Sequence, residues 1–310
     1  MHKKLLYSPK LKQGDLVRLV SPASYPPQID IAVNSDVLAS WGLRCDTGAH
    51  VLDEHGYMAG TDADRLKDLN NAFRDPEVRA ILTTRGGAGA YRIADDIDFA
   101  AVRSDPKPVI GFSDITYLHL SLLKQCQLGG IHGCLWGNNA QKTVKQLLMS
   151  TESITLHVNS NAVSAGISFP GRAEGRLIGG HLQSVATSVG VRLPPLKGAI
   201  VFLEYNKTSG LGTVDRHLTQ LIRSGALDGV AGVVLGSFEC LRGFSDRGWN
   251  IIDVLHDRLG LLNVPVLGGI DAGHDLVDKA GNPDQFALPL GGFATLDTHK
   301  GTLSVEPVVC

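Results

Sequence analysis

Residues 108–116 read PVIGFSDIT, an apolar run that passes at once into a polar turn and the start of a helix. The run Pro108–Gly111 predicts a buried strand, and the next residues predict a helix because their apolar members recur at helical spacing. These members are Ile115, Leu118, Leu122, Leu123 and Cys126. A strand that runs directly into a helix is the repeating unit of a parallel sheet with helices on its faces. We therefore expect Ser113, in the turn, to stand at the carboxyl end of a central strand.

The same alternation of short apolar runs and helical periodicity extends through the first half of the chain. Strands are predicted at Leu16–Ser21, Leu43–Thr47 and Ala80–Thr84. The glycine-rich residues 85–89 follow the last of these, and they predict a loop at the edge of the sheet where sites form in such folds. We expect an N-terminal α/β domain with a parallel sheet over residues 1–140.

Two helices between these strands carry further signals. The apolar residues of the first fall on one face, which predicts that this face is buried: Ile29, Val33, Val37, Leu38 and Trp41. Thr61 and Asp64 have the spacing of a capping box at the start of the second helix. Both helices are therefore expected to pack against the sheet.

The second half of the chain is predicted to be richer in strands. Residues 141–172 are expected to form a connector, and residues 173–310 a second, β-rich α/β domain. Short apolar runs predict buried strands at Ala199–Leu203, Val230–Leu235 and Val264–Ile270. The last residues predict a hairpin of Phe293–Thr298 with Thr302–Val308. The fold class is therefore α/β.

Composition excludes several functional classes. The 310 residues carry a net charge of −2 and are 43% hydrophobic, which is typical of a globular protein and gives no basic surface for nucleic acid. The five cysteines are far apart and odd in number, which favours reduced thiols in a cytoplasm. The sequence predicts neither a signal peptide nor a membrane helix, which needs roughly 18 apolar residues. We expect a cytoplasmic protein without nucleic-acid or membrane partners.

Ser113 has the placement of a catalytic nucleophile. Backbone N–H groups at the start of the following helix favour negative charge, so a hydroxyl here could attack a carbonyl whose oxyanion they receive. The alternative is that Ser113 only caps the helix, as serine often does. The segment alone leaves both open, because the Gly-x-Ser-x-Gly pattern of many serine hydrolases is absent and residue 115 is Ile.

A serine nucleophile needs a base and an acid that orients the base. Glu204 follows the apolar run Ile200–Leu203, and His274 follows an apolar run that ends at Ile270. Each alone is more simply explained as a structural or solvated residue. Together with Ser113 they occupy three predicted strand ends, in the chain order Ser, Glu, His that α/β-hydrolases also have.

Four segments form a distinctive series along the chain: Tyr57–Asp62, Asp75–Ile81, Arg85–Gly87 and Gly111–Thr116. Shorter motifs continue the series at Gly14-Asp15, Gly179-Gly180 with Leu182, Leu203-Glu204, Gly273-His274 and Leu288–Gly291. The series resembles the LD-carboxypeptidase family, which also contains the enzymes that give self-immunity to microcin C. The resemblance covers nearly the whole chain in the family's order.

This resemblance implies a Ser–His–Glu hydrolase without metal or cofactor, usually a homodimer, with its site between an α/β N-terminal and a β-rich C-terminal domain. Ser113 matches the family's nucleophile, Glu204 its triad acid and His274 its triad base. The backbone N–H groups of Gly87 and Asp114 match its oxyanion hole. The implied substrate is a small peptide, the murein tetrapeptide, whose terminal D-alanine is removed during cytoplasmic recycling of the cell wall.

The sequence departs from the family's pattern at positions that would line the pocket. Ala88 stands where a tyrosine is common, His181 where an asparagine is common, and Tyr205 where an acidic residue is common. The substrate therefore stays open. The alternative is a peptidyl or aminoacyl nucleotide, as in microcin immunity, whose base Trp136 or Tyr205 could stack on. A non-catalytic ligand-binding protein is a third possibility.

Other candidate residues are given simpler roles. Arg85 either binds a substrate carboxylate or pairs with Asp95 or Asp96. Arg92 occupies the third glycine position of the partial dinucleotide-binding pattern that begins at Gly87, which argues against such a site. The remaining histidines and cysteines lack the spacing of metal ligands and are expected to be structural, among them His132 with Cys134, His217 and His256.

Overall fold

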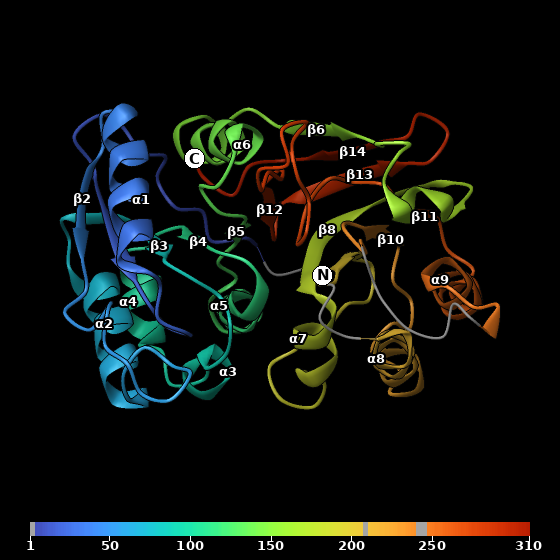
Figure 1. Cartoon of the computed structure of the whole chain (residues 1–310), viewed down its shortest axis with the longest axis horizontal. Helices are drawn as coiled ribbons and strands as arrows, with labels where there is room; N and C mark the ends of the chain where they lie inside the picture. Colours follow the sequence, from blue (N-terminus) through green and yellow to red (C-terminus); the bar gives the residue numbers. More distant parts are fainter. Residues whose placement is uncertain (1–3, 207–209, 240–246) are drawn as a thin grey trace.

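Two β-sheets organise the structure, a computed structural model that describes residues 4–206, 210–239 and 247–310 (Figure 1). The strands of the first sheet lie in the order β12-β5-β4-β3-β1-β2. Those of the second lie in the order β6-β14-β13-β8-β9-β10-β11-β7. The predicted α/β class, with an N-terminal parallel sheet and a β-rich second half, is confirmed.

The first sheet is built almost entirely from the N-terminal half. Its parallel strands are β1 (Leu16–Val20), β2 (Arg44–Thr47), β3 (Val78–Thr83), β4 (Val109–Ile110) and β5 (Gly130–His132). The helices between them are α1 (Gln28–Ser40), α2 (Asp62–Arg74), α3 (Ala90–Ile93), α4 (Phe99–Ser104) and α5 (Thr116–Cys126). The predicted capping box is present at the start of α2, where Thr61 and Asp64 each accept the other's backbone N–H.

One strand of this sheet comes from the far end of the chain. β12 (Leu288–Leu290) pairs antiparallel with β5, so that Leu288 lies opposite His132 and Leu290 opposite Gly130. The sheet is therefore mixed at this edge. The pairing of β12 with β5 has a physical reason: the short Leu-Pro-Leu run covers an edge of β5 that would otherwise carry unpaired backbone groups.

The second sheet combines a parallel centre with antiparallel edges. Its parallel strands are β8 (Arg172–His181), β9 (Ile200–Glu204), β10 (Gly232–Leu235) and β11 (Val266–Leu267). The antiparallel strands are β6 (Ile154–His157), β7 (Ser168–Phe169), β13 (Phe293–Asp297) and β14 (Thr302–Val305). The predicted hairpin is confirmed as β13–β14, and β6 and β7, from within residues 141–172, join this sheet.

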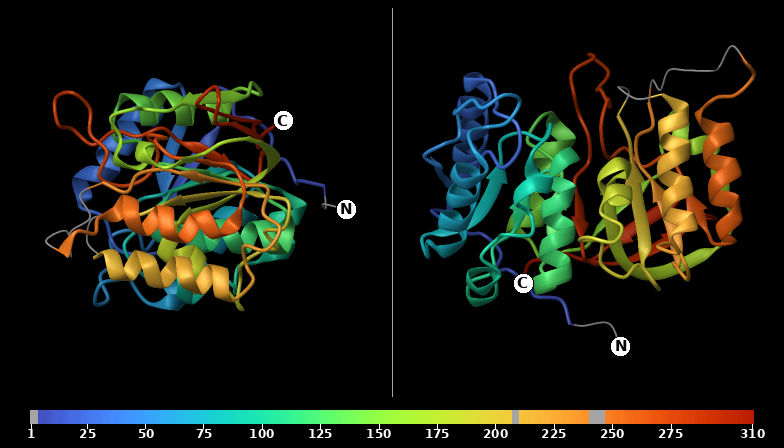
Figure 2. Two further views of the ribbon diagram at one scale, coloured as in Figure 1. Left: turned by 90° about the vertical axis from the view of Figure 1, so that its right-hand side faces the viewer. Right: turned by 90° about the horizontal axis from the view of Figure 1, so that it is seen from below.

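The helices of the second half are α6 (Asn138–Met149), α7 (Leu182–Thr187), α8 (Leu211–Arg223) and α9 (Ile251–Leu259). Helices α8 and α9 pack side by side along one face of the second sheet, on the side away from α6 (Figure 2). Among the described residues, every helix is too short or too polar to span a bilayer.

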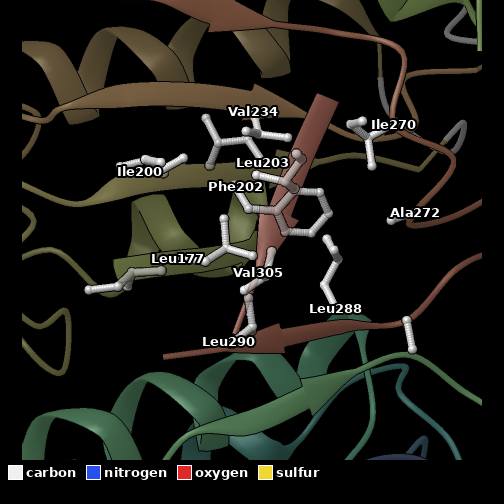
Figure 3. Packing of buried hydrophobic residues seen from close by; sticks show 14 of the residues in the cluster. Leu177, Ile200, Phe202, Leu203, Val234, Ile270, Ala272, Leu288, Leu290 and Val305 are labelled. Carbon is white, nitrogen blue, oxygen red and sulfur yellow. The ribbon is translucent and has the colours of Figure 1, made fainter. Parts of the chain in front are cut away.

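The two halves share a continuous hydrophobic core. Phe202 of β9 packs among residues of β8, β10 and β14, and Leu288 and Leu290 of β12 reach the same cluster (Figure 3). Ile110 of β4 and Ile131 of β5 belong to it as well. A core that crosses from one sheet to the other fixes their relative position, and with it the relative position of the strand ends that build the site.

The predicted buried face of α1 is wrong for its first turns. Ile29 is 67% exposed and Val33 43% exposed, whereas Asn34 and Leu38 are buried. The face is rotated because Asn34 points inward and lines the cavity described below. A polar residue on the inner face breaks the apolar pattern from which the prediction was made.

Candidate active site

Ser113 lies at the sharp turn that joins β4 to α5, as predicted. The turn is a short 3₁₀ segment, Ser113–Ile115, that begins directly after the strand. Ser113 has φ = 64°, in the left-handed region that non-glycine residues seldom adopt. Such a conformation costs about 1–3 kcal/mol and is retained where it aims a functional side chain, as in a nucleophile elbow.

The glycine-rich loop after β3 passes directly over this serine. A Cβ added at Gly86 would lie 2.7 Å from the Ser113 Cβ, so only glycine allows this approach. Within the described chain, the backbone N–H groups of Gly87 and Asp114 donate no hydrogen bond. Two free donors beside a hydroxyl are what an oxyanion hole requires.

Glu204, at the end of β9, meets His274, which lies in the loop that follows β11. Glu204 is the last residue of β9 and is fully buried, and its Oε2 lies 2.6 Å from Nδ1 of His274. The backbone N–H of His274 also donates to Oε2, at 3.2 Å. A Cβ added at Gly273, where φ is +114°, would lie 2.7 Å from the Glu204 Cβ. Glycine therefore allows the histidine loop to lie against the carboxylate.

The electrostatics of this pair favour an ionised Glu204. Burial alone would raise the pKa of the Glu204 carboxyl, but the charge and hydrogen bond of His274 outweigh burial and lower that pKa to about 2. Burial likewise opposes protonation of His274, and the facing carboxylate raises the His274 pKa above its ordinary value. A carboxylate hydrogen-bonded to Nδ1 fixes the tautomer whose Nε2 can accept a proton.

Ser113 shares one cavity with this pair. Both Ser113 and His274 line a cavity of about 390 Å³, and Phe112 packs against the His274 ring with centroids 4.8 Å apart. No hydrogen bond joins the Ser113 hydroxyl to His274 among the described residues. The structure thus brings Glu204 and His274 into contact and places Ser113 at the same cavity. Catalytic hydrogen bonds of ligand-free enzymes are often long and tighten only with substrate bound.

Arg85, for which the sequence left two roles open, also lines this cavity. Arg85 lines the cavity beside Asn34 and Trp136, and it donates to the Tyr25 carbonyl at 3.2 Å. Of the two alternatives for Arg85, the pairing with Asp95 or Asp96 is not found among the described residues, where Asp95 instead pairs with Arg192 at 2.6 Å. The Arg85 guanidinium is exposed and, in the described part of the chain, forms no ion pair. It is therefore available to an anionic ligand.

Ser113 also lines a second cavity, of about 480 Å³. Ala88, Asp114 and His181 line it, together with Tyr91 and Tyr117. Tyr205, which the sequence suggested as a substrate contact, is instead fully buried and stacks on His181 with centroids 5.1 Å apart. Tyr205 lies behind the cavity wall because it follows the buried end of β9, whereas His181, itself buried, lines the cavity.

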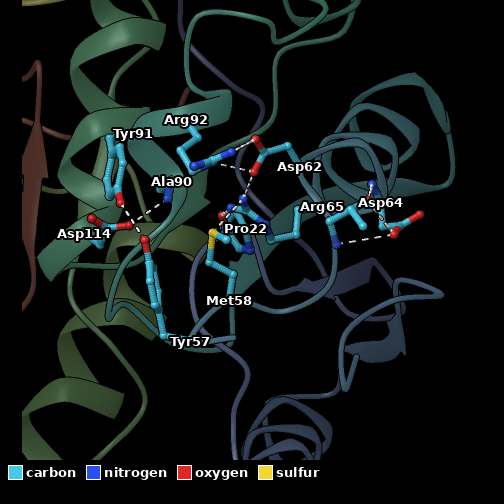
Figure 4. Close-up of polar contacts among 11 residues, drawn as sticks. Pro22, Tyr57, Met58, Asp62, Asp64, Arg65, Ala90, Tyr91, Arg92 and Asp114 are labelled. Atoms are coloured by element: carbon cyan, nitrogen blue, oxygen red, sulfur yellow. Dashed lines mark hydrogen bonds and ion pairs between the residues drawn. The ribbon is translucent and has the colours of Figure 1, made fainter. Parts of the chain in front are cut away.

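The Asp114 side chain ties the nucleophile's turn to the glycine-rich loop (Figure 4). Its Oδ2 accepts the Ala90 N–H at 2.7 Å, and burial raises the pKa of this carboxyl to about 6. Beside it, the hydroxyls of Tyr57 and Tyr91 lie 3.3 Å apart, and this bond raises the Tyr91 pKa to about 12. The sequence predicted a role only for the Asp114 backbone, and nothing in its pattern indicated the side-chain contact.

Two further side chains near the pair were not predicted as site residues. Gln285 accepts the Gly273 N–H at 2.8 Å and donates to the Cys134 sulfur at 3.3 Å, so it holds the histidine loop against the cavity wall. His132 is fully buried and faces Glu204. His132 is the last residue of β5, and the sequence predicted only a structural role for it.

One group of described side chains has the spacing of metal ligands. It consists of His50, Asp53 and Asp64, which belong to neither cavity at Ser113. These side chains already have protein partners, since His50 bonds Asp53 at 2.8 Å and Asp64 caps α2. Acidic groups of this kind are common on protein surfaces and do not by themselves indicate a metal site.

Comparison with known proteins identifies both halves of the chain. The sequence profile of the LD-carboxypeptidase N-terminal domain matches residues 17–133, and that of the LD-carboxypeptidase C-terminal domain matches residues 174–296. The chain is 35% identical to a putative carboxypeptidase of Streptomyces coelicolor, and the match covers 99% of both chains. It is 32% identical to a probable murein peptide carboxypeptidase of Bacillus subtilis, over 97% of this chain and 95% of the relative.

A solved structure supports the fold. The crystal structure of an MccF-like protein from Bacillus anthracis superposes with a TM-score of 0.85 at 24% identity, over 97% of this chain and 99% of that one. At this identity the likeness shows the arrangement of strands and helices only.

Proposed function

The chain belongs to the LD-carboxypeptidase family, and on that premise we propose that it is a serine carboxypeptidase that releases the terminal D-alanine of murein tetrapeptides. The bond hydrolysed is the amide between the L-centre of a diamino acid and D-alanine. The observation that supports the proposal most is the bonded His274–Glu204 pair at the cavity that Ser113 also lines.

In the proposed reaction, His274 Nε2 takes the proton of the Ser113 hydroxyl as its oxygen attacks the peptide carbonyl. Glu204 holds Nδ1–H and stabilises the imidazolium that forms. The carbonyl π electrons move to oxygen, and the tetrahedral oxyanion accepts the N–H groups of Gly87 and Asp114. Each donor of this kind contributes about 3 kcal/mol, or roughly 10²-fold in rate.

The second half of the reaction returns the enzyme to its starting state. The tetrahedral intermediate collapses and the C–N bond breaks, while His274 gives its proton to the departing amine of D-alanine. Water, deprotonated by His274, then attacks the acyl-enzyme ester; the C–O bond to Ser113 breaks, His274 returns the proton to the serine oxygen, and the shortened peptide leaves as a carboxylate. A carboxypeptidase must also recognise a terminal carboxylate, and Arg85 lines the cavity with its guanidinium open to such a group.

The proposal is tested with purified wild-type protein and Ser113→Ala, each incubated with a murein tetrapeptide and followed by mass analysis for the loss of one alanine. We expect wild-type release of D-alanine and a loss of at least about 10³-fold in the variant, because the substitution removes the attacking oxygen. Ser40→Ala, at the exposed end of α1, is the matched control. Wild-type turnover by the Ser113 variant would contradict the proposal.

A second candidate substrate is a peptidyl or aminoacyl nucleotide, and the placement of Trp136 favours it. Trp136 lines the cavity beside Arg85, where an aromatic ring could stack on a base. Tyr205 cannot serve this purpose because it is fully buried. Turnover of the tetrapeptide and of an aminoacyl sulfamoyl adenosine, measured side by side, separates the two, and kcat/KM decides between them.

Assembly and location complete the proposal. By resemblance to the family, we infer a homodimer acting in the cytoplasm, where cell-wall fragments are recycled. Light scattering of the purified protein tests the dimer. Fractionation of the producing cells tests the location.

A further inference from the structure

Only one of the two carboxylate oxygens of Glu204, the proposed triad acid, accepts hydrogen bonds among the described residues. Glu204 Oε2 accepts both the Nδ1–H and the backbone N–H of His274. Among the described residues, its second oxygen, Oε1, accepts no hydrogen bond, although the side chain is fully buried. An ionised carboxylate with an unsatisfied buried oxygen is costly, and such groups ordinarily have a partner close by.

The group that faces this oxygen is His132, the last residue of β5. Its Nε2 lies 3.9 Å from Glu204 Oε1, and both side chains are 0% exposed. The ring is fixed between Phe112 and Phe202, with centroids 5.9 Å and 5.2 Å away. In the described part of the protein, neither ring nitrogen has a hydrogen-bond partner. A polar ring is thus packed in an apolar setting with one nitrogen directed at the unsatisfied oxygen.

The surroundings of His132 favour a neutral ring. Burial lowers the pKa of His132 to about 3, although Glu204 opposes this, and the nearby rings of His119, His274 and His181 lower it further. A neutral imidazole carries one N–H, and in the described part of the chain the anionic atom that faces His132 Nε2 is Glu204 Oε1. The Nε2–H tautomer satisfies both buried groups at once, whereas the Nδ1–H tautomer would set two acceptors against each other.

We propose that His132 is a positioning residue that donates Nε2–H to Glu204 Oε1 and so fixes the carboxylate that orients His274. The 3.9 Å separation closes to a hydrogen bond when the carboxylate and ring approach by about 1 Å, as substrate binding tightens the site. With both oxygens held, the carboxylate cannot rotate away from Nδ1 of His274. A neutral donor achieves this without adding a positive charge that would disfavour the imidazolium. The inference rests on the proposed function, because it assigns the role within that triad.

The test compares His132→Met with His132→Gln in the full-length protein. Both remove the ring, but glutamine keeps an N–H donor at the reach of Nε2 and methionine has none. We expect methionine to lower kcat for the tetrapeptide by about 10- to 100-fold with KM within about twofold, the usual effect of losing an outer partner of a site residue. Glutamine should recover most of kcat. Equal losses in the two variants, or no loss in methionine, would overturn the proposal.

A proton NMR measurement follows the pair directly. The Nδ1 proton shared by His274 and Glu204 should give a low-field resonance that persists in His132→Gln and broadens in His132→Met. His119→Gln is the matched control, since His119 is equally buried but its Nε2 bonds the Gly111 carbonyl, 2.9 Å away. Broadening in that control as well would mean a general packing effect and would overturn the proposal.

If both His132 variants fail to fold, the proposal can still be tested by NMR on the wild-type protein labelled with ¹⁵N at histidine, which reports the tautomer of His132. The proposal requires His132 to be neutral, with the proton on Nε2, throughout pH 5–9; the opposite tautomer overturns it. Ser113→Ala separates this inference from the proposed function. If that variant kept its turnover, the assignment of Ser113 as the nucleophile would fall, while the tautomer of His132 would still be measurable.

Discussion

Gly273→Ala tests whether the histidine loop depends on its close approach to Glu204. Two costs add at this position. Gly273 has φ = +114°, and an alanine there costs about 1 kcal/mol of folding free energy because L-residues rarely adopt it. The new methyl would also lie 2.7 Å from Cβ and from Oε2 of Glu204. Contacts this short must open by roughly 0.7–1 Å, and overpacking of this kind costs a further ~1–3 kcal/mol.

The total expected loss is therefore about 2–4 kcal/mol of unfolding free energy, measured by urea denaturation followed by circular dichroism. Because the displacement falls on the Glu204–His274 bond, kcat for the tetrapeptide should also fall, by about 10²-fold for a shift near 1 Å. Gly190→Ala is the matched control. Gly190 has φ = +79° and nothing within 4 Å of an added Cβ, so it isolates the backbone cost.

We expect the control to lose about 1 kcal/mol and to keep its activity. The reasoning is refuted if Gly273→Ala matches Gly190→Ala in both measurements. A loss of stability with unchanged kcat would show that the loop moves as a unit without disturbing the pair.

Two further predictions concern charge. The acidic limb of the pH profile of kcat/KM should report the ionisation of His274, because this residue must be neutral to act as a base. Glu204 raises the His274 pKa, so activity should fall as the pH drops through a value above 6.5. In Glu204→Gln this limb should move to lower pH, with kcat reduced by about 10³- to 10⁴-fold; an unmoved limb would contradict the pairing. Arg85→Lys keeps the charge but not the planar fork, so KM for the tetrapeptide should rise by about tenfold while kcat changes little. An unchanged KM would exclude Arg85 from carboxylate binding.

The free energy of unfolding should depend on pH through the Glu204–His274 pair. The lowered pKa of Glu204 contributes stability that is present above its unfolded value and is lost as the pH falls through about 2. The raised pKa of His274 works in the opposite direction, since its contribution is complete below its unfolded value and is lost as the pH rises through its folded pKa. The pair therefore stabilises the protein most between these two limits, that is, in weakly acidic solution.

The sequence predicted those parts of the fold that local patterns specify. The turn at Ser113 was predictable because an apolar run, a polar turn and a helix follow one another without a gap. The approach of Glu204 and His274 could be expected from their placement after apolar strands, but not their 2.6 Å bond, which depends on the packing of the second sheet.

Other features depend on contacts between distant segments and left no local signal. Ile29 and Val33 have the right spacing for a buried face, yet the fold turns Asn34 inward at the cavity. Tyr205 is next to Glu204 in sequence, but its ring stacks behind His181. His132 ends a short strand that gave no sign of a role in the site, and the packing of β5 against β9 brings it opposite the second oxygen of Glu204.

The position of β12 has a consequence for how the chain matures on the ribosome. Residues 288–290 are made more than 150 residues after β5, yet they complete the sheet that carries Ser113. Until they emerge, the outer side of β5 exposes unpaired amide and carbonyl groups next to apolar side chains, which invites association with other nascent chains. The nucleophile's sheet therefore closes only after strands β6 to β11 of the second sheet have been made.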